Sequence, residues 1–306
     1  MIVVAGEALI DILVAPGGRL TAVPGGGPFN TARTIGRLGG AVAFLGVLST
    51  DRFGVVLREA LVRDGVDLSM APATDAPTTL AIAELDEAGT ATYRFHTAET
   101  SAPGLSPDAV AAAIALGPEA VHVGTLGLVL EPMASALVSG IAAADERILV
   151  MLDPNCRPSV IRDRAAYLGR LDAVLARTDI VKASVDDLGF IEPGTSAHDA
   201  AGELLDRGPA VVLVTDGDRP VRVLTRDLAF DVAVPSFAVV DSVGSGDAFG
   251  GAFLAQWVER GLGRRELADP GALREAVSFA IRVAGVTCGR AGADPPTRAE
   301  LGPLAR

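Results

Sequence analysis

Short apolar segments alternate with amphipathic segments along most of this chain. Continuous apolar runs indicate strands buried on both faces, and the segments between them carry apolar residues at helical spacing. This alternation predicts a mostly parallel sheet covered by helices on both faces, with ligands at the carboxyl ends of its strands. The predicted strands are residues 2–5, 42–48, 120–125, 148–153, 180–183, 211–215 and 221–225, and the predicted helices include 53–64, 107–116, 132–144 and 197–206.

Residues 78–95 interrupt this rhythm. Residues that favour strands lie on both sides of a turn at 86–89, which predicts a β-hairpin. Together with the stretch around residues 12–20, the hairpin is expected to form a small sheet beside the main one. The alternative is a surface hairpin that takes no part in a functional site.

The segment Asp241-Ser-Val-Gly-Ser-Gly-Asp247 carries the strongest chemical signal. Residues 237–240 predict a strand end, the glycines predict a turn, and the helical spacing of residues 249–257, closed by Gly261, predicts a helix. A glycine turn at a helix N-terminus presents N–H groups and a positive dipole end to an anion such as phosphate. The dipole is expected to keep Asp247 ionised, and this carboxylate suits a base that deprotonates an attacking hydroxyl.

Two other phosphate-binding motifs do not fit this turn. A Walker A loop requires a lysine after its second glycine, and the only lysine in the chain is Lys182. A dinucleotide-binding fingerprint requires a third glycine where Phe249 stands. The structural alternative is that Gly244 and Gly246 only make a tight turn and that Asp247 only caps a helix.

Composition narrows the classes of function. The chain has 306 residues, enough to bury a large core, and a formal net charge of −12. This acidic balance argues against nucleic acid or an anionic membrane as the main partner.

Met1 leads directly into a predicted strand and no apolar run is long enough to span a bilayer, so a cytoplasmic protein is expected. The two cysteines are expected to be free thiols, and the three histidines lack metal-ligand spacing.

Two motifs together resemble those of the ribokinase-like (PfkB) carbohydrate kinases. Residues 241–254 are similar to the family's C-terminal Gly-Ala/Ser-Gly-Asp motif. Gly25-Gly-Gly-Pro-Phe-Asn-Thr-Ala32 is similar to its N-terminal Gly-Gly-x-x-x-Asn-x-Ala motif. Counted from Gly26, it has one residue fewer between the glycines and the asparagine. The resemblance implies one ribokinase-like α/β domain over residues 1–306, with a mostly parallel central sheet covered by helices on both faces. It also implies a small β lid, made by about residues 12–24 and 76–98, and ATP-dependent phosphorylation of a sugar.

The same resemblance places the sugar against residues near the N-terminus. Gly6-Glu-Ala-Leu-Ile-Asp11 resembles the Gly-Glu-x-x-x-Asp of bacterial fructokinases, so Asp11 is expected to accept hydrogen bonds from two sugar hydroxyls. Gly26 and Gly27 let the backbone approach the sugar, and Asn30 contacts its rim. The alternatives are a strand-end turn for Asp11 and a helix cap before residues 31–38 for Asn30.

Two arginines are further candidates for contact with the substrate. Asp153-Pro-Asn-Cys-Arg157 resembles the Asp-x-Asn-x-Arg of fructokinases and 2-keto-3-deoxygluconate kinases, which directs Arg157 to the phosphates or the substrate. A surface salt bridge to Asp153 is the alternative. Arg94, in the hairpin, suits a keto or acidic sugar. Strand alternation puts Arg94 and His96 on one face and their aromatic neighbours on the other, and the sequence leaves open which face meets the substrate.

The resemblance assigns ATP to the second half of the chain. The backbone of Gly244, Ser245 and Gly246 forms the anion hole for the phosphates. Thr215 and Gly217 stand where the family has a Thr-x-Gly element near the ATP ribose.

Two acidic residues are candidates for cation binding. Ser184 and Asp187 replace an Asn-x-x-Glu element that governs magnesium and phosphate in the family, so Mg2+ is expected near Asp187, through water because the acid is short. A helix cap at Ser184 is the alternative. Asp241 matches a position that helps bind a monovalent cation in several relatives, with residues 286–293 expected to complete the site; K+ activation is therefore left open.

The motifs together favour D-fructose as the substrate, phosphorylated on its 6-hydroxyl by ATP with Asp247 as the base. The alternatives are a 2-keto-3-deoxygluconate kinase, then a ribokinase or nucleoside kinase, and, outside catalysis, a sugar-sensing binding protein on the same fold. The missing dinucleotide fingerprint argues against a dehydrogenase. The expected partners are the sugar, ATP and a second copy joined through the lids, without nucleic acid or membrane.

Overall fold

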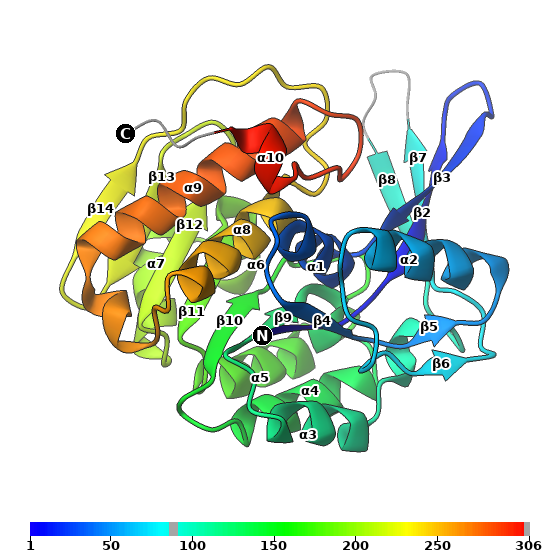
Figure 1. Cartoon of the computed structure of the whole chain (residues 1–306), viewed down its shortest axis with the longest axis horizontal. Helices are drawn as coiled ribbons and strands as arrows, with labels where there is room; N and C mark the ends of the chain where they lie inside the picture. The colour runs from blue at the N-terminus through cyan, green and yellow to red at the C-terminus, as the bar shows by residue number, and fades with distance from the viewer. Residues whose placement is uncertain (86–90, 303–306) are drawn as a thin grey trace.

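An eight-stranded sheet forms the centre of the computed structural model, which describes residues 1–85 and 91–302 (Figure 1). The strands from β12 to β4 run parallel, and β13 and β14 extend the sheet antiparallel at one edge. The mostly parallel sheet predicted from the sequence is therefore confirmed. In sheet order the strands are β14 (Ala229–Val232), β13 (Val221–Thr225), β12 (Val211–Thr215), β11 (Ile180–Ser184), β10 (Leu149–Asp153), β9 (Ala120–Gly124), β1 (Ile2–Ala5) and β4 (Val42–Leu45).

Helices cover both faces of this sheet, as its continuous apolar strands require. Successive side chains of β1 point to opposite faces, so Ile2 and Val4 join one buried cluster while Val3 and Ala5 join the other. The first cluster is covered by α1 (Gly27–Arg37), α2 (Arg52–Arg63), α8 (Ser245–Glu259), α9 (Pro270–Cys288) and α10 (Arg298–Leu301). The second is covered by α3 (Pro107–Ala115), α4 (Met133–Ala142), α5 (Arg164–Leu175), α6 (Val185–Ile191) and α7 (Ala197–Asp206).

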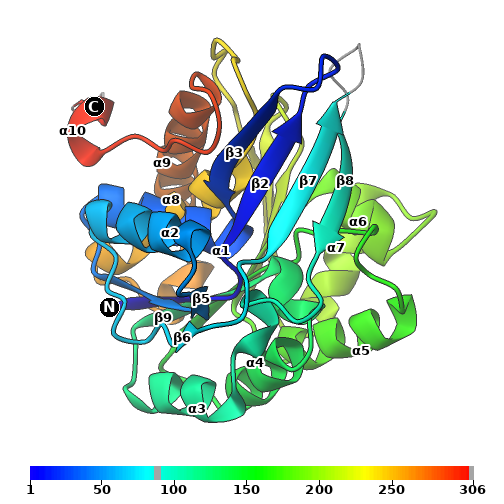
Figure 2. The same ribbon diagram turned by 90° about the vertical axis from the view of Figure 1, so that its right-hand side faces the viewer.

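A second, four-stranded sheet stands beside the main body (Figure 2). Its strand order is β3 (Leu20–Gly25), β2 (Leu9–Val14), β7 (Leu80–Leu85) and β8 (Ala91–His96). Strands β7 and β8 are antiparallel, so the predicted hairpin strands are confirmed, whereas the predicted turn at 86–89 falls within residues 86–90, outside the described part of the chain. Strands β5 (Leu48–Ser49) and β6 (Ala73–Thr74) form a short parallel pair.

One predicted strand is wrong in part and another is wrong altogether. The predicted strand 42–48 breaks at Gly46, where a Cβ atom would lie 2.3 Å from the Gly6 carbonyl oxygen; β4 ends before it and β5 follows. Residues 237–240 form no strand. Instead, the Phe237 ring packs against Gly285, and the Val240 N–H donates to the Cys288 carbonyl, so the end of α9 holds this segment outside the sheet.

No helix in the described part of the chain is both long and apolar enough to cross a membrane. Cys156 and Cys288 are free and partly buried, in agreement with the sequence analysis.

His122 is buried in β9, where neither ring nitrogen has a hydrogen-bond partner. Burial lowers its pKa to about 3, so the imidazole is neutral at ordinary pH.

A buried carboxylate directly before β11 links this strand to β10. Asp179, whose side chain is fully buried, accepts a hydrogen bond from the Val150 N–H at 2.8 Å. It also forms ion pairs with Arg177 at 3.2 Å and with Arg264 at 2.7 Å. Its loss would leave the Val150 N–H group without its acceptor and the poorly exposed Arg177 guanidinium with backbone carbonyls but without its carboxylate.

We therefore expect Asp179→Ala to lower the free energy of unfolding by about 3 kcal/mol or more, as removal of one partner from a buried ion pair typically does. Urea unfolding measures this change. The control is Asp231→Ala, which removes an exposed cross-strand pair with Arg222. Equal, small effects of the two substitutions would contradict the structural role of Asp179.

Candidate active site

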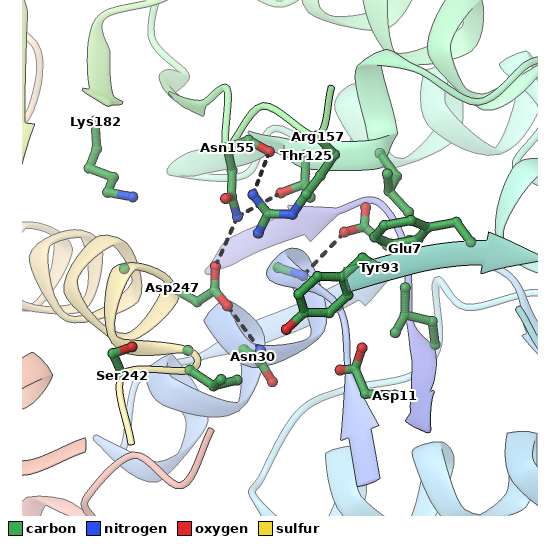
Figure 3. Close-up of a pocket in the computed structure, with 18 residues that line it drawn as sticks. Glu7, Asp11, Asn30, Tyr93, Thr125, Asn155, Arg157, Lys182, Ser242 and Asp247 are labelled. Carbon is green, nitrogen blue, oxygen red and sulfur yellow. Dashed lines mark hydrogen bonds between the residues drawn. The ribbon is translucent and has the colours of Figure 1, made fainter. Parts of the chain in front are cut away.

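A cavity of about 450 Å³ lies between the two sheets, where the carboxyl ends of β1, β9, β10 and β11 meet the second sheet (Figure 3). Parallel α/β sheets commonly bind ligands at this edge. Eight of the predicted site residues line it: Asp11, Gly26, Gly27, Asn30, Arg157, Gly244, Gly246 and Asp247. These residues come from the two ends of the chain and from its middle, and the fold brings them together.

The glycine turn opens α8 at one side of this cavity. Gly244 is the helix N-cap, with a left-handed φ of 76°, and no side chain caps the helix. A Cβ atom on Gly244 would lie 2.4 Å from that of Ala293, so only glycine fits. The uncapped N-terminus thus offers backbone N–H groups and a positive dipole end to an anion.

Asp247 lies in the first turn of α8, buried with 9% of its surface exposed. One carboxylate oxygen accepts a hydrogen bond from Asn30 at 2.9 Å, and the other accepts from Asn155 at 3.5 Å (Figure 3). Burial raises the pKa of Asp247 above its ordinary value, although the Asn30 bond, Lys182 and Arg157 each act to lower it. This direction is opposite to the one expected from the helix dipole alone, and it makes the carboxylate a stronger base.

Asn30 does not cap its helix, contrary to the alternative considered from the sequence. The helix α1 begins three residues earlier, with Gly26 as its N-cap at φ 110°. A Cβ atom on Gly26 would lie 2.8 Å from the Glu7 carbonyl oxygen, and one on Gly27 would lie 2.5 Å from the Thr125 hydroxyl. The glycines therefore permit a close approach of chain segments, and Asn30 is left free to hold Asp247.

Two further carboxyl groups lie at the other side of the cavity. Glu7 accepts a hydrogen bond from the Gly27 N–H at 3.1 Å, while its second carboxyl oxygen is buried without a partner. Burial raises the pKa of Glu7 to about 8 and that of Asp11 to about 6. Glu7 is thus largely protonated at neutral pH. Glu7 was not among the predicted site residues, although it stands inside the motif that ends at Asp11.

Two polar residues at the cavity have strained backbones, and neither was among the predicted site residues. Thr125 has a φ of 51° and Asn155 a φ of 39°, values that side-chain-bearing residues rarely adopt. Asn155 donates to the Thr125 hydroxyl at 3.4 Å as well as to Asp247. Such strain concentrates at functional sites, where the surrounding fold holds it in place.

Arg157 lines the cavity and donates to the backbone carbonyls of Asn155 and Cys156, both at 3.2 Å. The surface salt bridge to Asp153, the alternative considered for it, is not formed. Asp153 pairs instead with Lys182, whose ammonium lies 3.0 Å from the carboxylate. Lys182 also lines the cavity, so the fold supplies a lysine that is distant from the glycine turn in sequence.

The second sheet turns its aromatic face to the cavity. Tyr93 and Phe95 line it from β8 (Figure 3). Arg94, expected at the substrate, points to the opposite face, where its side chain is 66% exposed and pairs with Glu84. Because side chains alternate along a strand, Arg94 cannot share the face of Tyr93 and Phe95.

The remaining predicted residues lie outside the lining of this cavity. Ser184 and Asp187 form a reciprocal capping box at the start of α6, which was the structural alternative for Ser184. Asp187 also accepts from the Cys156 N–H at 2.6 Å, so hydrogen bonds already occupy both its oxygens. Ser184 is paired in register with Thr215, which ends β12 next to Gly217.

Asp241 contacts residues 286–293, the segment that was expected to complete a cation site with it. Its carboxylate accepts hydrogen bonds from the Val243 N–H at 3.0 Å and from the Gly292 N–H at 2.9 Å. Ser245 donates to the Ser242 carbonyl at 2.8 Å and does not line the cavity.

Among residues 1–85 and 91–302, no group of three or more His, Cys, Asp or Glu side chains is placed to hold a metal ion.

An uncapped helix N-terminus for phosphate and a buried base beside a polar cavity are the parts of a small-molecule kinase. Residues 1–300 match the pfkB family of carbohydrate kinases. The chain belongs to this family.

The chain is similar to several fructokinases. The fructokinase of Rhizobium leguminosarum bv. trifolii is 34% identical over 83% of this chain and 79% of its own length. Fructokinase-1 of Zea mays is 33% identical over 98% of this chain and 96% of its own length. The structure of a fructokinase with bound ATP from Xylella fastidiosa superposes with a TM-score of 0.90, at 28% identity, over 98% of this chain and 96% of that one.

The buried Glu7 generates a prediction about pH and stability. Its pKa is about 8 in the folded chain against an ordinary 4.5, so the folded state holds one more proton than the unfolded state between these values. Its contribution to stability is therefore complete below pH 4.5. That contribution falls by up to about 1.4 kcal/mol per pH unit above it and levels off beyond the folded pKa.

Glu7→Gln removes this titration, so the variant should gain in unfolding free energy relative to the wild type as the pH rises from 5 to 8. Urea unfolding of both proteins at several pH values measures the difference. The exposed Glu59→Gln on α2 controls for the loss of one negative charge. A difference that stays constant with pH would show that Glu7 is ionised in the folded protein.

Proposed function

We propose that this carbohydrate kinase is an ATP-dependent fructokinase that transfers the γ-phosphate to the 6-hydroxyl of D-fructose. The observation that carries the proposal is the position of Asp247, buried at the junction of the glycine turn and the polar cavity. The identities of 30–34% to fructokinases of bacteria and plants support fructose over other sugars. Asp247 would accept the proton of the hydroxyl as its oxygen attacks the γ-phosphorus.

The sugar would lie in the half of the cavity that Asp11, Asn30 and the backbone of Gly26 and Gly27 line. The Asp11 carboxylate would accept hydrogen bonds from two neighbouring hydroxyls, and the Asn30 amide would contact the hydroxyl next to the base. Residues of about 12–24 and 76–98 would act as a lid within one domain. Its aromatic face would exclude water from the sugar, which favours phosphate transfer to the sugar over hydrolysis.

ATP would place its phosphates at the backbone N–H groups of residues 244–246. Its ribose would lie along the adjacent ends of β11 and β12, near Ser184, Thr215 and Gly217. The bound ATP in the similar Xylella fastidiosa structure supports nucleotide binding by this fold.

Two cations would assist with the nucleotide. Mg2+, when bound, neutralises phosphate charge. Asp187 would hold it through water molecules, because its oxygens already accept three hydrogen bonds. K+ would be held near Asp241 and the C-terminal segment that contacts it.

The structure favours fructose over an acidic sugar for a specific reason. A 2-keto-3-deoxygluconate molecule needs a cation for its carboxylate. Arg94, the arginine expected there, lies on the outer face of the second sheet. Arg157 lines the cavity, but its guanidinium donates to the Asn155 and Cys156 carbonyls and its charge acts on the Asp11 carboxyl group. The Asp11 and Glu7 side chains would instead meet an acidic group with carboxyl groups of their own. A sugar-sensing protein without catalysis would have no use for a buried base at the phosphate turn. Association through the lids into a dimer stays a prediction.

The base is tested by Asp247→Asn, which keeps the size of the side chain and removes its basicity. We expect kcat to fall by about 10²–10⁴ while fructose binding changes little, because the lost interaction acts in proton transfer. ADP release measures kcat, and calorimetry measures binding. Asp199→Asn is the matched control, since Asp199 occupies the same third position of α7 and is exposed. Activity of Asp247→Asn within tenfold of wild type would rule out Asp247 as the base.

The substrate is tested by comparing kcat/KM for D-fructose, 2-keto-3-deoxygluconate, ribose and adenosine at saturating ATP. Fructose is expected to give the highest value. Its neutral hydroxyls suit the carboxyl groups of the cavity better than the carboxylate of 2-keto-3-deoxygluconate does, and the similarity to fructokinases favours it over ribose and adenosine. A clear preference for any of the other three would overturn the fructose assignment. Phosphate found on a position other than the 6-hydroxyl of fructose, read by NMR of the product, would overturn the proposed orientation of the sugar.

A further inference from the structure

Lys182 is chemically unusual within this chain. It is the only lysine, and the other 25 of the 26 basic side chains are arginines. It belongs to the central strand β11, its side chain is 5% exposed, and it lines the active-site cavity. Burial of an ammonium group is costly unless carboxylates or a ligand compensate its charge.

The ammonium lies between a carboxylate and the phosphate turn. Its nitrogen is 3.0 Å from Asp153, whose other carboxyl oxygen is buried without a partner. On the other side, a Cβ atom on Gly246 would lie only 2.9 Å from the same nitrogen. Figure 3 shows the Lys182 side chain extending from its strand toward the turn that carries Asp247.

Burial acts to lower the pKa of Lys182, but Asp153, Asp187 and Asp247 together raise it above its ordinary value. The side chain is therefore a cation at neutral pH. It lies beside the positive end of the α8 dipole, an arrangement that is repulsive by itself. Two positive groups that face the same space make a favourable site for an anion with several oxygens.

We propose that Lys182 is a catalytic residue. Its ammonium group keeps one hydrogen bond to Asp153 and donates another to the transferring phosphoryl group. The inference rests on the proposed kinase function and adds to it a residue for charge neutralisation. In the step, the sugar oxygen forms a bond to phosphorus, its proton goes to Asp247, and the bond from phosphorus to the leaving oxygen of ADP breaks. Lys182 keeps its three protons and stabilises the charge on the phosphoryl oxygens.

The site explains why the cation is a lysine. An ammonium has three donors around one atom, so it can hold Asp153 with one and reach a phosphate oxygen with another. The larger planar fork of an arginine would pair with both oxygens of Asp153, and it would have little room beside Gly246, where a Cβ atom would already lie 2.9 Å from the lysine nitrogen. Lys182→Arg is therefore expected to behave as a loss of function although it conserves the charge.

The single lysine permits a direct test without turnover. In protein labelled with [13Cε]lysine, one signal reports on Lys182. We expect this signal to shift when the non-hydrolysable analogue AMP-PNP is added with Mg2+, and to respond much less to AMP, which lacks the β- and γ-phosphates. An equal response to both nucleotides, or none to AMP-PNP once it is bound, would overturn the proposal. This measurement needs no sugar, so it stays decisive even if fructose is not the substrate.

Kinetics provide the second test. Lys182→Met alone would leave Asp153 buried and unpaired, so the informative comparison is Lys182→Met with Asp153→Asn against Asp153→Asn alone. Relative to Asp153→Asn, the double variant should lose about 10²–10³ in kcat, as removal of one transition-state donor does, with little change in the KM for sugar. A kcat within tenfold of Asp153→Asn would assign Lys182 a purely structural role. Thermal unfolding checks that both variants fold, and the NMR response decides if the double variant does not.

Discussion

The hydrogen bond from Asn30 to Asp247 joins two helix N-termini that lie 217 residues apart in sequence. It holds the proposed base against the segment that would bind the sugar, and the Thr31 hydroxyl adds a bond to the Asp247 carbonyl. This contact requires α1 and α8 to pack closely. Gly251 permits that approach, because a Cβ atom there would lie 2.9 Å from the Thr31 carbonyl oxygen. Direct contacts between α1 and α8 therefore hold the base, the phosphate turn and the sugar side of the cavity together.

Burial of charge is the second constraint on this site. Glu7, Asp11 and Asp247 converge with few opposite charges, and the pKa of each is raised, chiefly because burial disfavours the ionised carboxylate. A raised pKa increases the basicity that a proton-accepting group needs. Lys182 and Arg157 limit this effect at Asp247. The cavity thus balances a strong base against the cations that a phosphoryl group requires.

The second sheet shows how alternation along a strand divides functions between two faces. Tyr93 and Phe95 face the cavity, whereas Arg94 faces away and pairs with Glu84. An arginine on the inner face would have favoured an acidic substrate. The aromatic face instead supplies apolar surface over the polar cavity, which suits a neutral sugar.

The sequence by itself determined the parallel sheet, the glycine turn, Asp247 and the pfkB resemblance, because these depend on local periodicity and on short motifs. It could not determine that residues 237–240 lie outside the sheet, since their apolar pattern is strand-like and only the packing of Phe237 on Gly285 decides otherwise. Nor could it bring Lys182 to the phosphate turn. That proximity arises because β11 neighbours β10 in the sheet, which pairs Lys182 with Asp153, and because the first turn of α8 packs beside Lys182 at Gly246. Tertiary packing alone decides both.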